Sequence, residues 1–150
     1  IKLFKKTGAY LVPTLIAGDT VVKMAKSSNF MSPAIKEKAL RVGADMLGHF
    51  EVAHKAGVKI AFGTDSGVSR HGINAEEALL MQKGGMKPME ILVAATVNAA
   101  DLIDMSDSLG TIEAGKHADI IAMHGSPLDS LEELLDVDFV MKAGKAVKNK

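Results

Sequence analysis

Residues 58–67, VKIAFGTDSG, decide the fold of this 150-residue chain. The short apolar run at residues 58–62 ends in glycines and small polar residues, which favours a strand buried in a sheet. A second apolar run, AYLVPTLIA at residues 9–17, does not alternate and favours a strand buried on both faces. Pro13 cannot donate to a sheet, so we expect regular pairing to end near it. Two such strands separated by a helix predict an α/β fold with a parallel sheet and a right-handed crossover.

The helix expected between these strands begins at Ser32 and ends at Gly57. Ser32 can accept hydrogen bonds from the free amides of the first turn, and Pro33 suits the first helical position. Helical spacing predicts one apolar face, made by Ile35, Ala39, Val42, Met46, Phe50 and Ala53. Residues 18–31 are irregular and polar, which predicts a loop or lid. Residues 1–7 predict a short helix that ends at Gly8.

Two further helices are expected after GTDSG. Asn74, followed by Glu77 three residues later, predicts a helix start close to a capping box. Gly84 and Gly85 predict the end of that helix. Pro88 opens the next one, and the sequence ILVAATVNAADLI that follows is apolar on nearly all sides, so we expect a buried helix.

The character of the sequence changes near residue 110. Beyond it we expect short elements, namely a strand at residues 118–123, a helical turn at residues 130–135 and a hairpin of residues 138–142 and 145–148 about Ala143 and Gly144. The sequence therefore predicts two units, residues 1–109 and residues 110–150.

The composition is that of a globular protein, with 47% hydrophobic and 24% charged residues. Basic and acidic residues number 18 each and aromatic residues make up 4%, so we predict no binding of nucleic acid. No apolar run approaches the roughly 18–20 residues that cross a bilayer, so we predict no membrane partner. The chain has no cysteine, and any metal must therefore be bound through nitrogen and oxygen atoms.

The chain opens on IKLFKKTGAYLVPTL, without an initiator methionine or a targeting sequence. These residues read as the end of a helix that leads into a strand, so we expect the natural protein to begin earlier. The compartment stays open on this ground, with the cytoplasm as the default.

Asp65 is the first candidate for chemistry, because it directly follows a predicted buried strand. In parallel α/β folds, ligands bind at the carboxyl ends of strands, where a carboxylate can bind a metal or act as a general base. The alternative is an Asx turn, in which Asp65 only shapes the chain as it leaves the strand. His71 can orient a carbonyl, move a proton or bind metal, or can be a solvated loop histidine. The other histidines are expected to be structural or exposed, namely His49, His54, His117 and His124.

Three segments together resemble the C-terminal part of metal-dependent amidohydrolases, namely AFGTDSGVSRHGINAEEALLMQKGGMKPMEILVAATVNAADLI, LGTIEAGKHADIIAM and DFVMKAGKAV. The branch that they resemble is that of prolidase-like and imidazolonepropionase-like enzymes, which includes Xaa-Pro dipeptidases and Xaa-Arg carboxypeptidases. The resemblance covers essentially the whole chain and is strongest over residues 58–123. Its most specific part is the order of GTDSG, HG-x-N-x-x-E and GTIEAGKHAD.

This resemblance implies the C-terminal part of a (β/α)8 barrel, a TIM-like barrel, together with part of a small β-sandwich domain. Residues 9–15 would form the seventh barrel strand and residues 58–62 the eighth. Asp65 would be the aspartate after strand eight, which binds the metal and accepts a proton from metal-bound water. His71 matches the histidine of the following loop, which is expected to contact substrate.

Three further residues lie in this loop or at the start of the helix that follows it. Asn74 and Glu77 fit the family pattern, but helix capping accounts for both, so we assign them no part in the chemistry. Arg70 stands where relatives often have proline, and its charge could pair with a substrate carboxylate.

The implied reaction is hydrolysis of an amide or peptide bond in a small peptide or acyl-amino-acid substrate. One or two divalent metal ions, zinc by expectation, would polarise the carbonyl and lower the pKa of bound water. No HxH pair occurs in the sequence, so the remaining metal ligands are expected outside this chain. We therefore expect a fragment that is inactive alone, that needs the N-terminal part of the barrel as a partner, and that can form a homo-oligomer.

Two other interpretations stay open. The chain could be a self-contained α/β interaction module without catalysis, or a degenerate remnant without function. The surroundings of Asp65 distinguish an enzyme from a module. An enzyme requires histidines from another segment or chain to converge on Asp65, whereas a module would place it in an Asx turn of a closed sheet.

Overall fold

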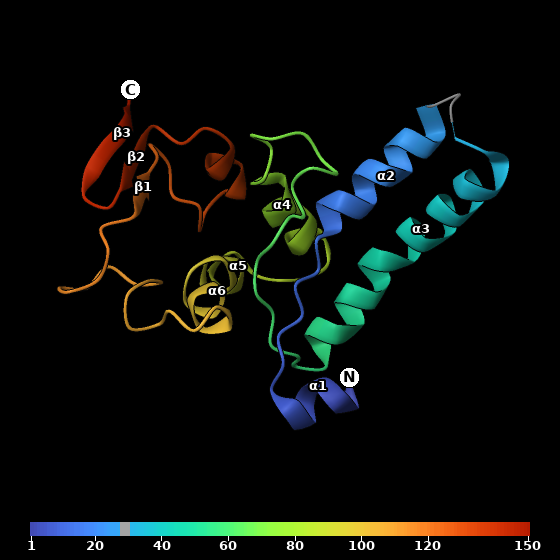
Figure 1. The fold of residues 1–150 in the computed structure, drawn as a ribbon, viewed down its shortest axis with the longest axis horizontal. Coiled ribbons are helices and arrows are strands. Elements are labelled where there is room, and N and C mark those ends of the chain that lie inside the picture. The colour runs from blue at the N-terminus through green and yellow to red at the C-terminus, as the bar shows by residue number, and fades with distance from the viewer. Residues whose placement is uncertain (28–30) are drawn as a thin grey trace.

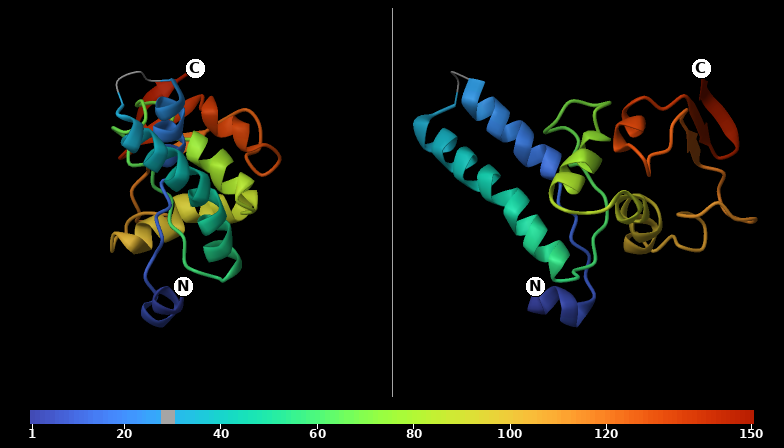
Figure 2. Two further views of the ribbon diagram at one scale, coloured as in Figure 1. Left: turned by 90° about the vertical axis from the view of Figure 1, so that its right-hand side faces the viewer. Right: turned by 180° about the vertical axis from the view of Figure 1, so that it is seen from behind.

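The computed structural model describes residues 1–27 and 31–150. The helices within this part are α1 (Lys2–Thr7), α2 (Leu15–Ser27), α3 (Pro33–Lys55), α4 (Glu76–Lys83), α5 (Pro88–Ala95), α6 (Val97–Leu102) and the 3-10 helix η1 (Leu131–Leu135). The strands are β1 (Ile120–Ala122), β2 (Phe139–Lys142) and β3 (Lys145–Asn149). The α2–α3 pair and the three strands lie at opposite ends of the molecule, with α4, α5 and α6 between them (Figures 1 and 2).

The two predicted strands run side by side and parallel, and they form a single bridge between Leu11 and Ile60. The N–H of Leu11 donates to the carbonyl of Lys59 at 2.8 Å, and the N–H of Ala61 donates to the carbonyl of Leu11 at 3.1 Å. The α/β class and the parallel direction are therefore confirmed. The bridge at Leu11 agrees with the expectation that pairing ends near Pro13. The last part of the apolar run, residues 15–17, is helical instead of extended, because α2 begins at Leu15.

Helix α2 occupies most of the stretch that we predicted as a loop. Residues 18–27 of that stretch are helical, and residues 28–30 lie outside the described part. The reason is tertiary, because α2 packs closely on α3 through two glycines. A Cβ atom added to Gly18 would lie 2.2 Å from the sulfur of Met46, and one added to Gly43 would lie 2.0 Å from a methyl group of Val22. Such packing overrides the low helix propensity of glycine and polar residues.

The boundaries predicted for α3 are confirmed, but its apolar face is only partly buried. The hydroxyl of Ser32 accepts a hydrogen bond from the N–H of Ile35 at 3.4 Å, and Gly57 follows the helix with a φ of 73°. Phe50, near the end of the helix, is 2% exposed, whereas Ile35 is 56% exposed and Val42 is 47% exposed. The first half of the predicted face therefore lies at the surface.

Helices α4 and α5 end and begin at the predicted glycine and proline. The N–H of Gly84 donates to the carbonyl of Leu80 at 3.0 Å, and Pro88 is the first residue of α5. The predicted cap of α4 is wrong, because α4 begins at Glu76 and Asn74 makes other contacts. The apolar helix is also interrupted at Thr96, whose hydroxyl donates to the carbonyl of Leu92 at 2.7 Å.

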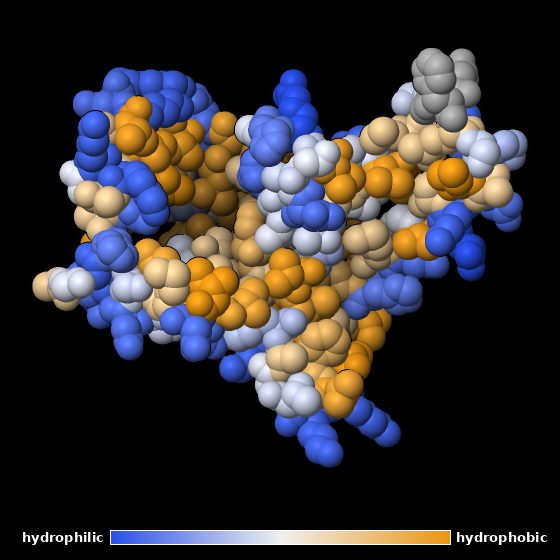
Figure 3. All heavy atoms as spheres, in the orientation of Figure 1, coloured by the Kyte–Doolittle hydropathy of each residue, from blue (hydrophilic) through white to orange (hydrophobic). Residues whose placement is uncertain are grey.

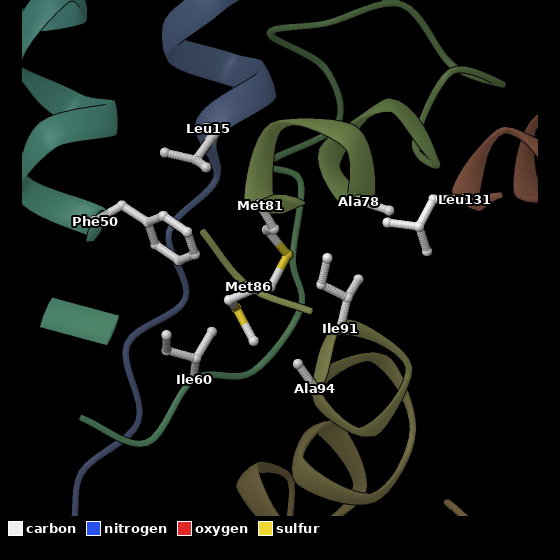
Figure 4. Close-up of a cluster of buried hydrophobic side chains, with 9 residues drawn as sticks. All are labelled: Leu15, Phe50, Ile60, Ala78, Met81, Met86, Ile91, Ala94 and Leu131. Carbon is white, nitrogen blue, oxygen red and sulfur yellow. The ribbon is translucent and has the colours of Figure 1, made fainter. Parts of the chain in front are cut away.

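The hydrophobic core lies where α4 and α5 meet the parallel segments (Figure 4). Its buried residues are Leu15, Phe50, Ile60, Ala78, Met81, Met86, Ile91, Ala94 and Leu131. Leu131 belongs to η1 and is 0% exposed, so residues beyond position 110 contribute to the same core as the helices before it.

The three strands form an antiparallel sheet in the order β1-β2-β3. Ile121 is paired with Val140, and the β2–β3 hairpin turns at Ala143 and Gly144, whose φ values are 49° and 78°. Consecutive left-handed residues are typical of the two-residue turns that match the twist of a hairpin. The predicted hairpin is therefore confirmed. Among the helices that the structure describes, none has the length and apolar character needed to cross a bilayer.

Candidate functional site

The candidate site lies where the two parallel segments end. Thr14 and Asp65 follow the paired residues Leu11 and Ile60, and they adopt left-handed backbone conformations with φ values of 46° and 50°. This conformation costs an L-residue roughly 1–2 kcal/mol, and such strain gathers at functional sites. Because the segments are parallel, both strained residues lie at the carboxyl edge, where α/β folds bind ligands.

The Asp65 side chain is exposed and its carboxylate is open to a ligand. Within residues 1–27 and 31–150, no residue donates a hydrogen bond to this carboxylate. The turn is closed by the backbone instead, because the N–H of Val68 donates to the carbonyl of Asp65 at 3.2 Å. An Asx turn would use the N–H of Gly67, which donates to the carbonyl of Ser69 at 3.2 Å. The structure therefore does not form the Asx turn of the alternative interpretation.

A polar network holds the residues on either side of Asp65. The side-chain amide of Asn74 donates to the hydroxyl of Ser66 at 2.6 Å and to that of Thr64 at 3.2 Å. The two hydroxyl oxygens lie 2.9 Å apart. Asn74 thus fixes the turn that carries Asp65 rather than capping α4. The polar composition of the loop is the sequence feature that points to hydrogen bonds here. It does not by itself identify Ser66 and Thr64 as the partners of Asn74.

His71 lies on the same loop as Asp65, residues 63–75, and its side chain is exposed. In the part of the chain that the structure describes, no hydrogen bond or ion pair joins the two side chains. Arg70, the neighbour of His71, is also exposed. This single loop therefore exposes a carboxylate, an imidazole and a guanidinium group to solvent.

Glu77 belongs to α4, as predicted, but it caps a different helix from the one that sequence reasoning expected, namely α2. Its side chain is 0% exposed and accepts hydrogen bonds from the N–H groups of Leu15 at 2.9 Å and Ile16 at 2.7 Å. Glu77 therefore anchors the N-terminus of α2, where the strained residue Thr14 turns the chain. Burial raises the pKa of the Glu77 carboxyl, and the two N–H donors act in the opposite direction.

Asp65 also borders an apolar groove between α2 and α3. The groove has a volume of about 240 Å³. The apolar residues that line it include Val21, Val42, Met46 and Val68. The candidate site thus combines an exposed carboxylate with an adjoining apolar surface.

The metal ligands available in the described residues are few. No group of three or more histidine, aspartate or glutamate side chains converges there. The exposed carboxylate of Asp65 and the imidazole of His71 are donor types that divalent metals accept, so Asp65 fits the role of one ligand. His54 has a structural position, since its ring stacks on Phe50 with centroids 6.4 Å apart and lies 3.4 Å from Glu90.

The geometry is that of an α/β domain with a candidate site at the carboxyl end of parallel strands. The sequence matches the Amidohydrolase family over residues 1–147, and the chain belongs to this family. It is 33% identical to an ochratoxinase of Aspergillus niger over 155 aligned positions, which cover 98% of this chain and 31% of that protein. It is 38% identical to an imidazolonepropionase of Shouchella clausii, with 62% of this chain and 22% of that protein covered.

Solved structures give the same result. A Xaa-Pro dipeptidase crystallised with methionine in its active site superimposes with a TM-score of 0.94 at 40% identity, over 99% of this chain and 36% of that one. A structure described as a putative prolidase from Bifidobacterium longum superimposes with a TM-score of 0.82 at 30% identity, over 95% of this chain and 36% of that one. The predicted family resemblance is confirmed. The chain spans about a third of the length of the ochratoxinase, at 31%.

Proposed function

We propose that this chain supplies the C-terminal part of a metal-dependent amidohydrolase that cleaves an amide or peptide bond. The observation that carries the proposal is the position of Asp65. Its exposed carboxylate stands in a left-handed turn at the carboxyl end of a parallel segment, in a chain that belongs to the Amidohydrolase family. A carboxylate at that edge of the sheet can bind a metal and move a proton.

In this proposal the segments of residues 9–14 and 58–62 take the places of the seventh and eighth strands of a (β/α)8 barrel. Residues 110–150 belong to a small β-sandwich domain. The other barrel strands come from an N-terminal part outside these 150 residues, and the chain is inactive without them. The aligned share of the Xaa-Pro dipeptidase, 36%, supports this arrangement. Assembly as a homo-oligomer is part of the same proposal.

Asp65 is the residue of this chain that would bind a divalent metal ion, which we expect to be zinc. One or two ions would be bound, and ligands outside the chain would complete their coordination. When bound, such an ion polarises the substrate carbonyl and lowers the pKa of a bound water molecule. The donor chemistry of an exposed carboxylate fits this role.

The proton transfer is the step that we assign to Asp65. One oxygen of its ionised carboxylate accepts a proton from the attacking water, and the same oxygen returns that proton to the nitrogen of the leaving amine. The exposure of Asp65 leaves space for water and substrate. His71 contacts the substrate, and the neighbouring Arg70 offers a charge to a substrate carboxylate. The substrate class is a small peptide or an N-acyl amino acid.

A chimera tests this proposal. Residues 1–150 would replace the matching part of the Xaa-Pro dipeptidase, to which they are 40% identical. With added zinc, we expect the chimera to hydrolyse dipeptides or N-acyl amino acids, whereas the chain alone does not. Asp65→Asn keeps a residue that tolerates the left-handed conformation but removes the proton acceptor, so turnover should fall by at least about a hundredfold.

Three outcomes would contradict the proposal. The first is a folded chimera that is inactive on all these substrates, and the second is an Asp65→Asn chimera as active as its parent. Robust turnover by the chain alone would contradict the part of the proposal that requires an N-terminal partner. Arg70→Ala separately tests the carboxylate contact, because its loss should raise KM for substrates with a free carboxylate and leave kcat unchanged.

A further inference from the structure

The groove beside Asp65 is a feature that the proposed proton transfer does not use. It lies between α2, α3 and the turn of Asp65, and its volume is about 240 Å³. Its apolar lining comprises Ala17, Val21, Ala39, Val42, Met46 and Val68. Asp65 is the one charged residue among the described residues that line the groove. An occupant must therefore be apolar along most of its contact surface.

The packing of α2 on α3 explains why apolar side chains stay at the surface here. The close packing at Gly18 and Gly43 fixes the distance between α2 and α3, so the groove cannot close by moving the helices together. Val42 and Val68 remain 47% and 40% exposed, although helical spacing predicts Val42 on a buried face. Figure 3 shows apolar residues interspersed with charged ones over this helix pair. Covering such side chains with an apolar ligand contributes about 25 cal/mol per Å² of area removed from water.

We propose that this groove binds the apolar side chain of the substrate residue next to the scissile amide bond. The inference rests on the proposed function of Asp65. Asp65 belongs to the candidate reaction site and also lines the groove together with Val42 and Met46. In this proposal the side chain next to an amide bond at the Asp65 carboxylate enters the groove. The groove thereby narrows the substrate class to peptides or N-acyl amino acids with an aliphatic or aromatic residue at that position.

The size and the charge of the groove both favour such an occupant. An apolar cavity of about 150 Å³ is large enough for benzene, so a groove of about 240 Å³ has space for the side chain of leucine or phenylalanine. A charged side chain would lose hydration without gaining a partner, because the proposed reaction already uses the Asp65 carboxylate. Lysine and glutamate at this substrate position are therefore disfavoured.

The first test fills the groove in the chimera described above. Val42→Phe adds a ring to the groove wall, and Ile35→Phe adds the same ring to a residue of α3 that is 56% exposed and does not line the groove. We expect Val42→Phe to lower kcat/KM for a leucine substrate relative to the matching alanine substrate by about tenfold or more. The Ile35→Phe control should leave this ratio unchanged.

The second test measures binding without turnover in the 150-residue chain itself. Methyl signals of Met46 and Val42 are followed by NMR as N-acetyl-leucinamide is added, with N-acetyl-lysinamide as the control probe. We expect the leucine probe to shift both methyl signals and the lysine probe to leave them in place. Equal shifts with the two probes would overturn the proposed selectivity.

The outcomes separate this inference from the function on which it rests. One outcome is that the chimera hydrolyses its substrates but Val42→Phe leaves the ratio of kcat/KM for the leucine and alanine substrates unchanged. This outcome overturns the groove proposal and leaves the proposed function in place. A groove covered by another segment or by a second copy of the chain would give that same result. A folded chimera without hydrolysis overturns the proposed function and the substrate role of the groove together, whatever the methyl signals show.

Discussion

The two ends of the parallel segments are held in different ways. At the amino end, the hydroxyl of Tyr10 donates to the carboxylate of Asp101 at 2.6 Å, and the ammonium group of Lys59 lies 4.9 Å from the centre of the Tyr10 ring. At the carboxyl end, Thr14 and Asp65 adopt left-handed conformations. One end is tied by ordinary side-chain contacts, and the other stores backbone strain. This division matches parallel α/β folds, in which the carboxyl end carries ligands and the amino end carries stability.

The two strained turns differ in whether the side chain that holds them is buried or exposed. The turn of Thr14 leads into the N–H groups of Leu15 and Ile16. These N–H groups donate to the carboxylate of Glu77, which is fully buried. The turn of Asp65 is held by the exposed side chain of Asn74. A buried anchor makes a turn rigid and closes it to ligands, whereas an exposed one leaves room for substrate. We therefore expect changes at the first turn to affect mainly folding, and changes at the second to affect mainly chemistry.

The largest effect on stability is expected for Glu77→Ala. This change leaves the buried N–H groups of Leu15 and Ile16 without an acceptor, so the free energy of unfolding should fall by about 3 kcal/mol. Urea unfolding measures the loss, and hydrogen exchange should show reduced protection of those two amides. The control is Glu76→Ala in the same helix, for which a change within about 0.5 kcal/mol is expected. Equal losses in the two variants would show that Glu77 is not an anchor.

Asn74→Ala is expected to lower stability less than Glu77→Ala does, and to act mainly on activity. The side chain is exposed, so removing its hydrogen bonds to Ser66 and Thr64 should cost about 1 kcal/mol. In the chimera we expect kcat to fall by about tenfold with little change in KM, because the turn of Asp65 loses its support. Asn98→Ala is the matched control, since its amide donates to the carbonyl of Ile60 at 2.8 Å. An equal fall of kcat in this control would show a general effect of destabilisation.

A gain of stability is expected when glycine replaces either strained residue. Thr14→Gly and Asp65→Gly relieve the left-handed strain, and the greater freedom of glycine in the unfolded chain offsets part of the gain. The net increase in the free energy of unfolding should be about 0.5 kcal/mol for each. The reverse change, Gly67→Ala, should destabilise, because φ is 125°. No atom of the described residues lies within 4 Å of an added Cβ, which leaves backbone strain as the cause. A destabilised Thr14→Gly would show that its side chain matters more than its backbone.

These turns also show where sequence patterns are informative and where they are not. Signals that act within one turn of chain, such as Ser32, Pro88 and the Ala143–Gly144 pair, predict the observed helix starts and the hairpin. The position of Asp65 at the end of a strand is predicted for the same reason. The partners of Glu77 lie 61 and 62 residues away in sequence, and no local pattern identifies them.

Helix α2 and the groove were not predicted, because both depend on tertiary packing. The helix propensity of residues 18–22 is low, and contact with α3 at Gly18 and Gly43 stabilises the helix. The groove exists only after α2 and α3 are placed beside the turn of Asp65. The position of Asp65 after the strand could thus be predicted from the sequence, whereas the shape of the candidate site required the fold.

The smallest effect on stability and activity is expected for a change at the amino end, where Tyr10 contacts Asp101. The hydrogen bond to Asp101 is the main cause that raises the pKa of Tyr10 from 10.0 to about 12. Because the folded state holds this proton more tightly, the contact stabilises the protein below about pH 10 and is lost as the pH rises through about 12. The sequence has one tyrosine and no tryptophan, so ultraviolet titration of the phenol observes this residue alone.

Asp101→Asn is the variant that breaks this contact. Without the carboxylate, the pKa of Tyr10 should return towards its ordinary value of 10.0, and Asp107→Asn should leave the raised value in place. The contribution to stability at neutral pH should be small, because the pair is accessible to solvent. In the chimera, kcat should not change in either variant. A loss of turnover in Asp101→Asn would mean that the two ends of the strands are coupled, and the division between a stabilising end and a reactive end would be wrong.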